Sequence, residues 1–475
     1  MLRVPTVRTR VAVAGARVVS TLSQRVGFGS GTVVGGHVGL VFDPRLLEHL
    51  AAGRRMALVS GTNGKTTTTH LLAAAVEGAL GPVATNATGS NMPSGHVTAL
   101  ASAPPGAAAV LEVDEGYLAG LLGALSPEAV VLLNLSRDQL DRTNEVRMVA
   151  NRWRAALAAT SDPASTSGAA TWSRAARSGA ATTTTIANAD DPLVTWAASA
   201  AAKTIWVGAG LSWRQDAVAC PACAGRVRFA NAEADGGAGL DGWACACGFV
   251  RPRLDVRLEG DDIVLADGRR LELVLALPGR FNRANAVMAA VAATEMGVGW
   301  DDALCRIAAV QEVAGRFSVV EVGGCTTRMM LAKNPAGWRE LLDLVGPSGR
   351  AVAIGINARV ADGRDPSWLW DVPFERLRGR TVVATGERCR DLSVRLRYAD
   401  VPHRTVRDEV AAVRAAWIAG GRASPATIPA EPAPSATIPV EPGEVQVDFV
   451  GNYTAFTDLM ARSARSARAR RRAGA

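Results

Sequence analysis

Aromatic side chains are scarce in this sequence: Phe, Trp and Tyr together make up 5% of the 475 residues. Alanine, valine and leucine must therefore supply most of the packing, and a hydrophobic content of 48% against 20% charged residues excludes a mostly disordered chain. A long apolar run is also missing. The longest stretch without a formal charge, Gly78–Leu111, contains four prolines, so we expect no membrane-spanning helix.

A strong charge of one sign is missing from the body of the chain. The net charge is +8, but six arginines within the last fourteen residues supply most of it, and without these six the balance is +2. We therefore expect no nucleic-acid-binding body. The six are Arg462, Arg465, Arg468, Arg470, Arg471 and Arg472. Following the last predicted helix, such a tail either binds an anionic membrane surface or serves as a solubilising, disordered segment.

Cysteine is infrequent, with seven residues of which four are clustered. This usage fits a reduced compartment and a metal site better than a disulfide framework. The N-terminal region has no acidic residue before Asp43, yet Arg8, Arg10 and Arg17 interrupt its apolar stretches and exclude the apolar core of a signal peptide. We therefore expect a cytoplasmic protein.

Apolar runs of strand length alternate with longer helical stretches, which is typical of a parallel α/β sheet. Such runs lie at Met56–Ser60, Ala108–Val113, Val130–Leu135, Thr204–Val207, Ala351–Ile356 and Val382–Thr385. A change from a helical to a strand pattern near Ala314 predicts a domain boundary. A Pro/Ala-rich segment at 423–444, with a near-repeat ATIPxEP, predicts a flexible insert of polyproline character.

A phosphate-binding loop is predicted within Met56–Val76, which reads MALVSGTNGKTTTTHLLAAAV. A strand, a Gly-containing turn and a helix opening with Lys65 and Thr66 allow backbone N–H groups and the helix N-terminus to bind a phosphate. The lysine then contacts the β- and γ-oxygens, and the threonine hydroxyl binds Mg²⁺. Gly61 and Gly64 are separated by two residues, where the common loop has four. The alternative, an ordinary strand-to-helix turn, leaves the Lys-Thr pair without a purpose.

Carboxylates follow two of the predicted strands. Glu112 and Asp114 end the run VLEVDE, and Asp138 and Asp141 lie in NLSRDQLDR after the run VVLLNL. Because side chains beyond the carboxyl ends of parallel strands face the ligand crevice, these four are candidate ligands for the nucleotide's metal. For each of them, a solvated cap residue is the alternative.

The four clustered cysteines, Cys220, Cys223, Cys245 and Cys247, predict a zinc site. The first pair has the spacing of a zinc knuckle, with Gly225 placed so that backbone N–H groups reach the thiolates, whereas the second pair is shortened to CxC. The intervening loop of 21 residues is compatible with a Cys₄ ribbon. A structural role is favoured because few basic or aromatic neighbours are available for nucleic acid. The alternative is a hairpin that has lost its metal.

The chain resembles the Mur ligase superfamily of ATP-dependent amide-forming enzymes. Five segments match in order: SGTNGKTTT from Ser60, LEVDE from Leu111, NLSRDQLDR from Asn134, NADDP from Asn188 and LPGRFNRANAVMAA from Leu277. Within that superfamily the chain is similar to MurT-like subunits of lipid II isoglutaminyl synthases. The reasons are the absence of a UDP-sugar-binding domain before the loop, the four-cysteine insertion, and the segments KNPAGW from Lys333 and DGRDPSWLWD from Asp362.

The resemblance implies an α/β fold with a Mur ligase-type central P-loop domain that carries a Cys₄ zinc-ribbon-like insertion, followed by a smaller Rossmann-like C-terminal domain. We expect an N-terminal helical segment at 1–50, the ATP-binding domain at 51–313 with its insertion at 215–255, and the C-terminal domain at 314–475. The last of these includes the flexible insert at 423–444 and the basic tail at 462–475.

The implied function is ATP-dependent amidation of the D-glutamate α-carboxyl of lipid II to D-isoglutamine through an acyl phosphate. Ammonia would come from a GatD-like glutamine amidotransferase subunit in a heterodimer, because no glutaminase is recognised in this chain. Cys305, Cys325 and Cys389 lack a nucleophile motif and are expected to be buried thiols. The implied cofactors are ATP, Mg²⁺ and structural Zn²⁺, without nucleic acid. The lipid substrate would place the enzyme at the inner face of the cell membrane.

By motif correspondence, Lys65 and Thr66 would hold phosphate and Mg²⁺, and Glu112 would be a further Mg²⁺ ligand. The loop residues expected to bind the nucleotide are Gly61, Thr62, Asn63, Gly64, Lys65, Thr66 and Thr67. Asn282 and Asn285, on one face of a helix, would approach the adenine; an N-cap and a polar surface residue are the alternative.

Other motif positions depart from the family pattern or have structural roles. Gln139 replaces the histidine of many Mur ligases, and a neutral carboxamide is a weaker metal ligand, so the sequence does not favour a second metal there. Asp190 and Asp191 are expected to shape a turn.

The resemblance also implies that this subunit lends an aspartate to the histidine of its glutaminase partner. Asp365 is favoured, flanked by Pro366 and Trp368; Asp371 is a substitute, and Asp362 reads as a turn former. The alternative is that all three only cap turns. Two other functions stay open, a folylpolyglutamate synthetase-like amino-acid ligase and a noncatalytic nucleotide-binding scaffold. The first usually has a DYAH-like motif where this chain has LAKNP from Leu331.

Overall fold

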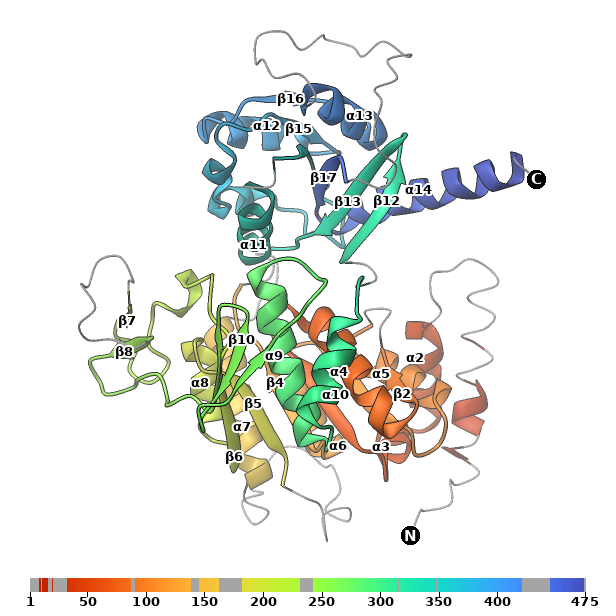
Figure 1. Cartoon of the computed structure of the whole chain (residues 1–475). Coiled ribbons are helices and arrows are strands. Elements are labelled where there is room, and N and C mark those ends of the chain that lie inside the picture. The colour runs from red at the N-terminus through yellow and green to blue at the C-terminus, as the bar shows by residue number, and fades with distance from the viewer. Residues whose placement is uncertain are drawn as a thin grey trace. The chain divides into compact units, whose positions relative to one another are not determined.

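In the computed structural model the chain forms two compact units (Figure 1). The structure describes residues 8–9, 11–15, 19, 32–86, 90–137, 145–161, 182–230, 242–313, 316–346, 349–420 and 445–473. Unit 1 takes the described residues within 1–137 and 144–311, and unit 2 those within 312–475. The predicted insert at 423–444 and the residues Asp138, Gln139 and Asp141 lie outside the described residues.

Unit 1 is built on a sheet whose described strands run in the order β11-β10-β9-β6-β5-β4-β1-β3-β2. Neighbours from β2 to β9 are parallel, and β9, β10 and β11 are antiparallel. The strands are β1 Met56–Ser60, β2 Val83–Thr85, β3 Ala108–Val113, β4 Ala129–Leu132, β5 Thr184–Asn188, β6 Lys203–Gly208, β9 Val256–Glu259, β10 Asp262–Leu265 and β11 Arg270–Glu272. The predicted parallel α/β organisation is confirmed.

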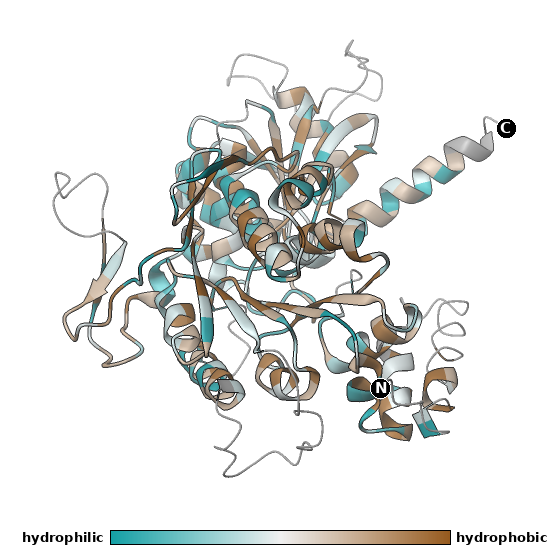
Figure 2. Ribbon diagram, turned by 60° about the horizontal axis from the view of Figure 1, so that its bottom comes forward, coloured by the Kyte–Doolittle hydropathy of each residue, from teal (hydrophilic) through white to brown (hydrophobic). Residues whose placement is uncertain are grey.

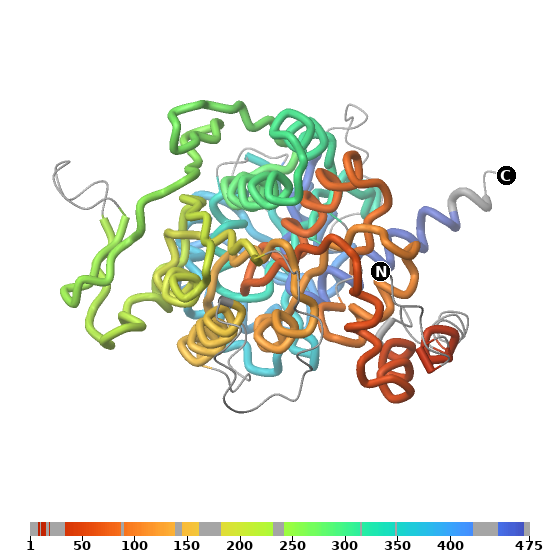
Figure 3. The backbone as a smooth tube through the Cα atoms, turned by 90° about the horizontal axis from the view of Figure 1, so that it is seen from below, coloured from red at the N-terminus to blue at the C-terminus, as the bar shows by residue number. Residues whose placement is uncertain are grey.

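Helices cover both faces of this sheet (Figure 3). On one face α4, α9 and α10 pack together, and α6, α7 and α8 pack on the other. The helices are α2 Thr32–Phe42, α3 Leu46–Ala51, α4 Lys65–Leu80, α5 Pro93–Ser102, α6 Leu118–Leu125, α7 Val146–Ser161, α8 Pro192–Ala198, α9 Arg280–Glu295 and α10 Trp300–Ala308. Because both faces are covered, β1, β3 and β4 are buried along their whole length and are mainly apolar (Figure 2).

A small hairpin of β7 (Val227–Phe229) and β8 (Trp243–Cys245) belongs to unit 1 but forms its own two-stranded sheet. It follows the short 3₁₀ helix η2 (Gln215–Ala217). Its core consists of Cys220, Val227, Trp243 and Cys245, with Phe229 and Phe249 packed against it.

Unit 2 contains a second sheet with the described order β12-β13-β17-β14-β15-β16, parallel except for the pair β12–β13. Its strands are β12 Phe317–Val322, β13 Cys325–Leu331, β14 Ala351–Gly355, β15 Val382–Thr385, β16 His403–Thr405 and β17 Val447–Gly451. Its helices are α11 Pro335–Val345, η4 Ser367–Asp371, η5 Phe374–Leu377, α12 Cys389–Tyr398, α13 Glu409–Gly420 and α14 Tyr453–Ala473.

The basic tail differs from expectation. Arg462, Arg465 and Arg468 lie within α14, so the prediction that they follow the last helix is wrong. Alanine and arginine are both strong helix formers, and their alternation carries the helix onward. Among the described residues, no helix combines the length and the apolar character needed to cross a bilayer.

Candidate functional site

The predicted phosphate loop joins the end of β1 to the start of α4. Gly61 has φ +145° and Gly64 has φ +87°, in the region that side chains rarely adopt. A Cβ on Gly61 would lie 2.9 Å from Cβ of Leu133, and one on Gly64 would lie 2.4 Å from Oδ1 of Asn285. Both glycines are therefore required by backbone conformation and by close approach.

Lys65, the first residue of α4, lies back over the loop. Its Nζ donates to the carbonyl oxygens of Gly61 (2.5 Å) and Thr62 (3.0 Å), and pairs with Oε2 of Glu115 at 3.0 Å. The side chains of Lys65 and Glu115 are only 9% and 12% exposed, so solvent screens this ion pair weakly. Glu115 belongs to the LEVDE segment, and sequence reasoning assigned it no role.

Thr66 and Glu112 meet at the carboxyl end of β3. The Thr66 hydroxyl donates to Oε2 of Glu112 at 2.7 Å, and both residues are buried. A hydroxyl and a carboxylate oxygen so close together are the ligand types that Mg²⁺ prefers. Asp114 lies in the turn after β3, where its Oδ1 accepts the Gly116 amide at 3.0 Å. Asp114 therefore forms a turn in the structure, and its role as a metal ligand stays a prediction.

The backbone of Glu112 is held by two residues that sequence reasoning missed. Asn86 donates Nδ2 to the Glu112 carbonyl and accepts the Glu112 amide at Oδ1, each at 2.8 Å. His96 Nε2 lies 2.8 Å from the same carbonyl, and burial lowers the pKa of His96. A neutral ring therefore donates from Nε2. No motif marks either residue, because both act through main-chain atoms of a distant strand.

The residues after β4 bind the other side of the loop. Thr62 N donates to the Asn134 carbonyl, and Asn63 N donates to Asn134 Oδ1, each at 2.9 Å. Ser136 N donates to the Thr62 hydroxyl at 2.9 Å. We call Asn134–Arg137 the NLSR segment. In the sequence, the NLSRDQLDR motif marks these residues, but nothing in it indicates that they support the loop.

The two predicted adenine residues lie near the start of α9 and are buried. Asn285 abuts Gly64 of the loop. Asn282 donates Nδ2 to the Pro278 carbonyl at 2.7 Å. The helix therefore places Asn285 beside the phosphate loop. Contact of Asn282 and Asn285 with adenine stays a prediction.

Replacing Gly64 with alanine should weaken the binding of a magnesium-nucleotide by about tenfold, because a strained φ and the displaced Asn285 amide together cost about 1–3 kcal/mol. Gly81→Ala is the matched control: Gly81 also has a positive φ, +77°, but its Cβ would meet no atom within 4 Å. Calorimetric titration with a non-hydrolysable ATP analogue compares them. Equal losses in both variants would mean that crowding against Asn285 has no effect.

The aspartates of NADDP have structural roles, as expected. Asp191 caps α8 by accepting the Leu193 and Val194 amides, and its Oδ2 accepts the Leu135 amide at 2.8 Å. Burial raises the pKa of Asp191 to about 6. Asp190 pairs with Arg251 at 2.7 Å. These contacts secure the turn after β5.

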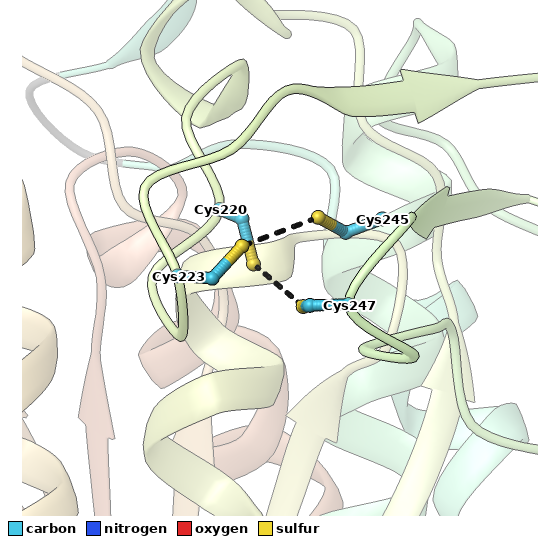
Figure 4. Close-up of side chains that lie close together, drawn as sticks. All are labelled: Cys220, Cys223, Cys245 and Cys247. Carbon is cyan, nitrogen blue, oxygen red and sulfur yellow. Dashed lines mark hydrogen bonds between the residues drawn. The ribbon is translucent and has the colours of Figure 1, made fainter.

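The four cysteines converge in unit 1 (Figure 4). All four Sγ atoms lie within 4.8 Å of one another, with Cys220–Cys247 at 3.8 Å and Cys223–Cys245 at 3.6 Å. Gly225 N donates to the Cys223 sulfur at 3.3 Å, as predicted. Burial raises the pKa of Cys220, whereas a hydrogen bond from the Phe249 backbone lowers the pKa of Cys247 to about 7.

The three cysteines outside the cluster are free thiols. Cys325 and Cys389 are buried, as predicted, but Cys305 is exposed, so the prediction that it is a buried thiol is wrong. It lies on α10, away from that helix's buried residues.

The three aspartates of DGRDPSWLWD differ in unit 2. Asp362 is 4% exposed and accepts the Thr454 amide (2.8 Å) and hydroxyl (2.5 Å) at the start of α14. Asp365 is exposed, and its Oδ1 accepts the Ser367 amide at 2.8 Å. Asp371 is also exposed, at the end of η4. Asp362 is thus occupied inside the unit.

Comparison with known proteins identifies two families. The Mur ligase middle domain matches residues 59–163, and the MurT ligase C-terminal domain matches residues 331–420. A lipid II isoglutaminyl synthase (glutamine-hydrolyzing) subunit MurT of Streptococcus pneumoniae is 28% identical over 79% of this chain and 83% of that relative. The subunit of the same name from Staphylococcus aureus (strain COL) is 26% identical over 83% of this chain and 89% of its own length.

Among solved structures, MurF from Acinetobacter baumannii has a TM-score of 0.57 at 14% identity and covers 90% of this chain and 80% of its own. A likeness at that identity shows the fold alone. The two families cover separate parts of the chain, and the two subunits match most of its length. The resemblance expected from the five sequence segments is thereby confirmed: the chain is similar to MurT-like Mur ligases.

Proposed function

We propose that this chain is the synthetase subunit of a lipid II isoglutaminyl synthase: it amidates the α-carboxyl of the D-glutamate of lipid II, at the expense of ATP, in peptidoglycan biosynthesis. The relatives matched over most of their length carry this activity in their names. The observation that carries the proposal is the arrangement of Lys65, Thr66 and Glu112 around one phosphate loop.

The chemistry follows from this arrangement. A carboxylate becomes an acyl donor only after phosphorylation, and ammonia then displaces phosphate from the acyl phosphate to leave the amide. The loop amides and Lys65 would stabilise the charge that develops on the transferred phosphoryl group. Thr66 and Glu112 would hold Mg²⁺, which neutralises phosphate charge when bound.

The Lys65 ammonium must change partner for this role. In the structure it binds Glu115 and two loop carbonyls. A γ-phosphate brings more negative charge than one carboxylate, so the lysine would move to the phosphate when ATP binds.

Reconstitution tests the proposal. The chain and a glutaminase subunit are incubated with ATP, Mg²⁺, glutamine and a soluble lipid II analogue, and mass spectrometry detects conversion of the carboxyl to an amide with matching phosphate release. Failure with both glutamine and free ammonia would contradict the proposal. A product enlarged by an amino acid would instead support the amino-acid ligase, and ATP binding without any product the scaffold.

Asp365 would serve the glutaminase partner. It is exposed two residues before η4, where its Oδ1 accepts the Ser367 amide at 2.8 Å. A carboxylate hydrogen-bonded to an imidazole fixes its tautomer and stabilises the imidazolium. Asp362 is buried and its carboxylate is already bound by the Thr454 amide and hydroxyl, which argues against Asp362 in this role.

A zinc ion held by Cys220, Cys223, Cys245 and Cys247 forms a further part of the proposal. Tetrahedral zinc with Zn–S bonds of about 2.3 Å requires sulfurs about 3.8 Å apart. The sulfurs of Cys223 and Cys245, 3.6 Å apart, and those of Cys220 and Cys247, 3.8 Å apart, fit that spacing. The hairpin's few core residues include two of the cysteines, so the metal would also stabilise the hairpin.

Purified untagged chain should contain about one zinc per molecule by elemental analysis. Cys220→Ser should lose the metal, because three thiolates remain, whereas Cys305→Ser should retain it, since Cys305 lies outside the cluster. A stable wild-type chain that lacks metal after purification without chelators would argue against zinc.

The C-terminal part of α14 would hold the enzyme at the membrane that carries its substrate. Arg462 is already paired with Asp408 and Glu409, but Arg465 and Arg468 are exposed. Each basic residue near an anionic surface contributes about 1 kcal/mol. Co-sedimentation with phosphatidylglycerol vesicles checks this, and binding unaffected by truncation after Ser463 would reject it.

A further inference from the structure

The cysteine hairpin is joined to the phosphate loop by one buried carboxylate. Asp216 belongs to η2, four residues before Cys220. It accepts the Arg137 amide at 3.0 Å and Arg137 Nε at 2.5 Å. Its Oδ2 also accepts Trp213 Nε1 at 2.6 Å. The Asp216 side chain is only 4% exposed and is engaged on both oxygens, while the Arg137 side chain that it pairs with is 53% exposed.

Arg137 ends the NLSR segment, which is bonded to the loop itself. Asn134 accepts the main-chain amides of Thr62 and Asn63, each at 2.9 Å. Main-chain atoms of Ser136 bind the Thr62 hydroxyl, which accepts the Ser136 amide at 2.9 Å and donates to the Ser136 carbonyl at 3.0 Å. A continuous hydrogen-bonded path therefore runs from the phosphate loop through the NLSR segment to Asp216. Thr62, at one end of this path, and the Asp216 side chain, at the other end, are buried.

The segment that carries Asp216 is built into the cysteine knuckle. Val218 and Cys220 pair with the returning chain: Val227 N donates to the Val218 carbonyl at 2.9 Å, and Cys220 N donates to the Gly225 carbonyl at 2.7 Å. The strands of the hairpin are three residues each. A hairpin of this size is marginal in water without a further constraint, which four thiolates around one metal would supply.

Other contacts anchor the hairpin without touching the loop. Trp243 Nε1 donates to the Ala189 carbonyl at 2.9 Å, and Arg251 pairs with Asp190 at 2.7 Å. These bonds reach the turn after β5. That turn meets the NLSR segment in its own way, because Asp191 accepts the Leu135 amide at 2.8 Å, whereas Asp216 contacts the NLSR segment directly from the chain that leads into the knuckle.

We propose that Asp216 is a positioning residue that couples the metal-loaded cysteine cluster to the phosphate loop, so that metal at the cluster favours nucleotide binding. The inference rests on the proposed nucleotide and metal sites. Its physical basis is preorganisation: a knuckle closed by metal fixes Asp216, which fixes the NLSR segment and with it the loop amides that receive phosphate. The cluster would then be more than a separate stabilising module.

The test measures affinity, not activity. Full-length chain is titrated calorimetrically with a non-hydrolysable ATP analogue in excess Mg²⁺, with and without prior removal of zinc by a zinc-selective chelator, and zinc is quantified in each sample. Removal of zinc should weaken binding to the wild type by about tenfold, and added zinc should restore it. Asp216→Asn should retain its zinc and its melting temperature, yet bind the analogue about tenfold more weakly.

The decisive result is non-additivity. Because coupling passes through Asp216, removal of zinc should weaken the Asp216→Asn variant little further. Asp267→Asn, which breaks only an exposed pair with Arg269 in the same unit, should behave as the wild type. Wild-type affinity in zinc-loaded Asp216→Asn, or an equal effect of zinc on both chains, would overturn the coupling while leaving the proposed function intact. A zinc-loaded wild type that binds no nucleotide would contradict both.

Discussion

Replacing Lys65 with alanine should abolish ATP-dependent amidation while the chain still binds its glutaminase partner. The substitution removes the Lys65 ammonium, whose Nζ lies 2.5 Å from the Gly61 carbonyl of the loop. Loss of such a charge contact to a transferred phosphoryl group costs about 3 kcal/mol or more of barrier, on the order of 100-fold in rate. Amide formation in the reconstituted pair, measured with saturating free ammonia, checks this result.

The same substitution leaves Glu115 buried without its ammonium partner, which by itself destabilises the site. The double variant Lys65→Ala, Glu115→Gln separates the two effects, because it should regain stability without regaining activity. Lys203→Ala, at an exposed pair with Glu295, is the matched control and should be fully active. Near-normal turnover by Lys65→Ala would remove the lysine from the mechanism.

Replacing Asp365 with asparagine should abolish glutamine hydrolysis by the complex and spare amidation with free ammonia. A neutral amide cannot stabilise an imidazolium as a carboxylate does, and the loss of such an orienting aspartate lowers the rate by about 10⁴ in a comparable triad. Glutamate release from glutamine by the reconstituted pair measures the first activity, and amide formation with ammonium chloride measures the second.

Asp371→Asn is the control for this variant, since Asp371 is exposed at the other end of the same turn. It should hydrolyse glutamine normally. Size-exclusion chromatography must show the complex intact in both variants. Full glutaminase activity in Asp365→Asn, together with loss in Asp371→Asn, would transfer the role to Asp371. Loss of both activities in Asp365→Asn would indicate a structural role in this subunit.

The sequence by itself determined the features that depend on local pattern. Strands buried on both faces are continuous apolar runs, so β1, β3 and β15 have the predicted bounds. The phosphate loop could also be predicted from local pattern. Gly61, Gly64, Lys65 and Thr66 lie within six residues, and their roles follow from their place between a strand and a helix. The cysteine cluster was predicted from side-chain type and spacing alone.

Tertiary structure decided which groups support these features. Asn86 and His96 hold the main chain of Glu112, and Asp216 holds Arg137, 79 residues away. Pattern cannot reveal such partners, because a hydrogen bond to a main-chain atom leaves no required side chain at the other end. The structure also distinguished buried Asp362 from exposed Asp365, which the sequence presents three residues apart in one loop. Burial is set by the elements that pack over a residue, and those elements are distant in sequence.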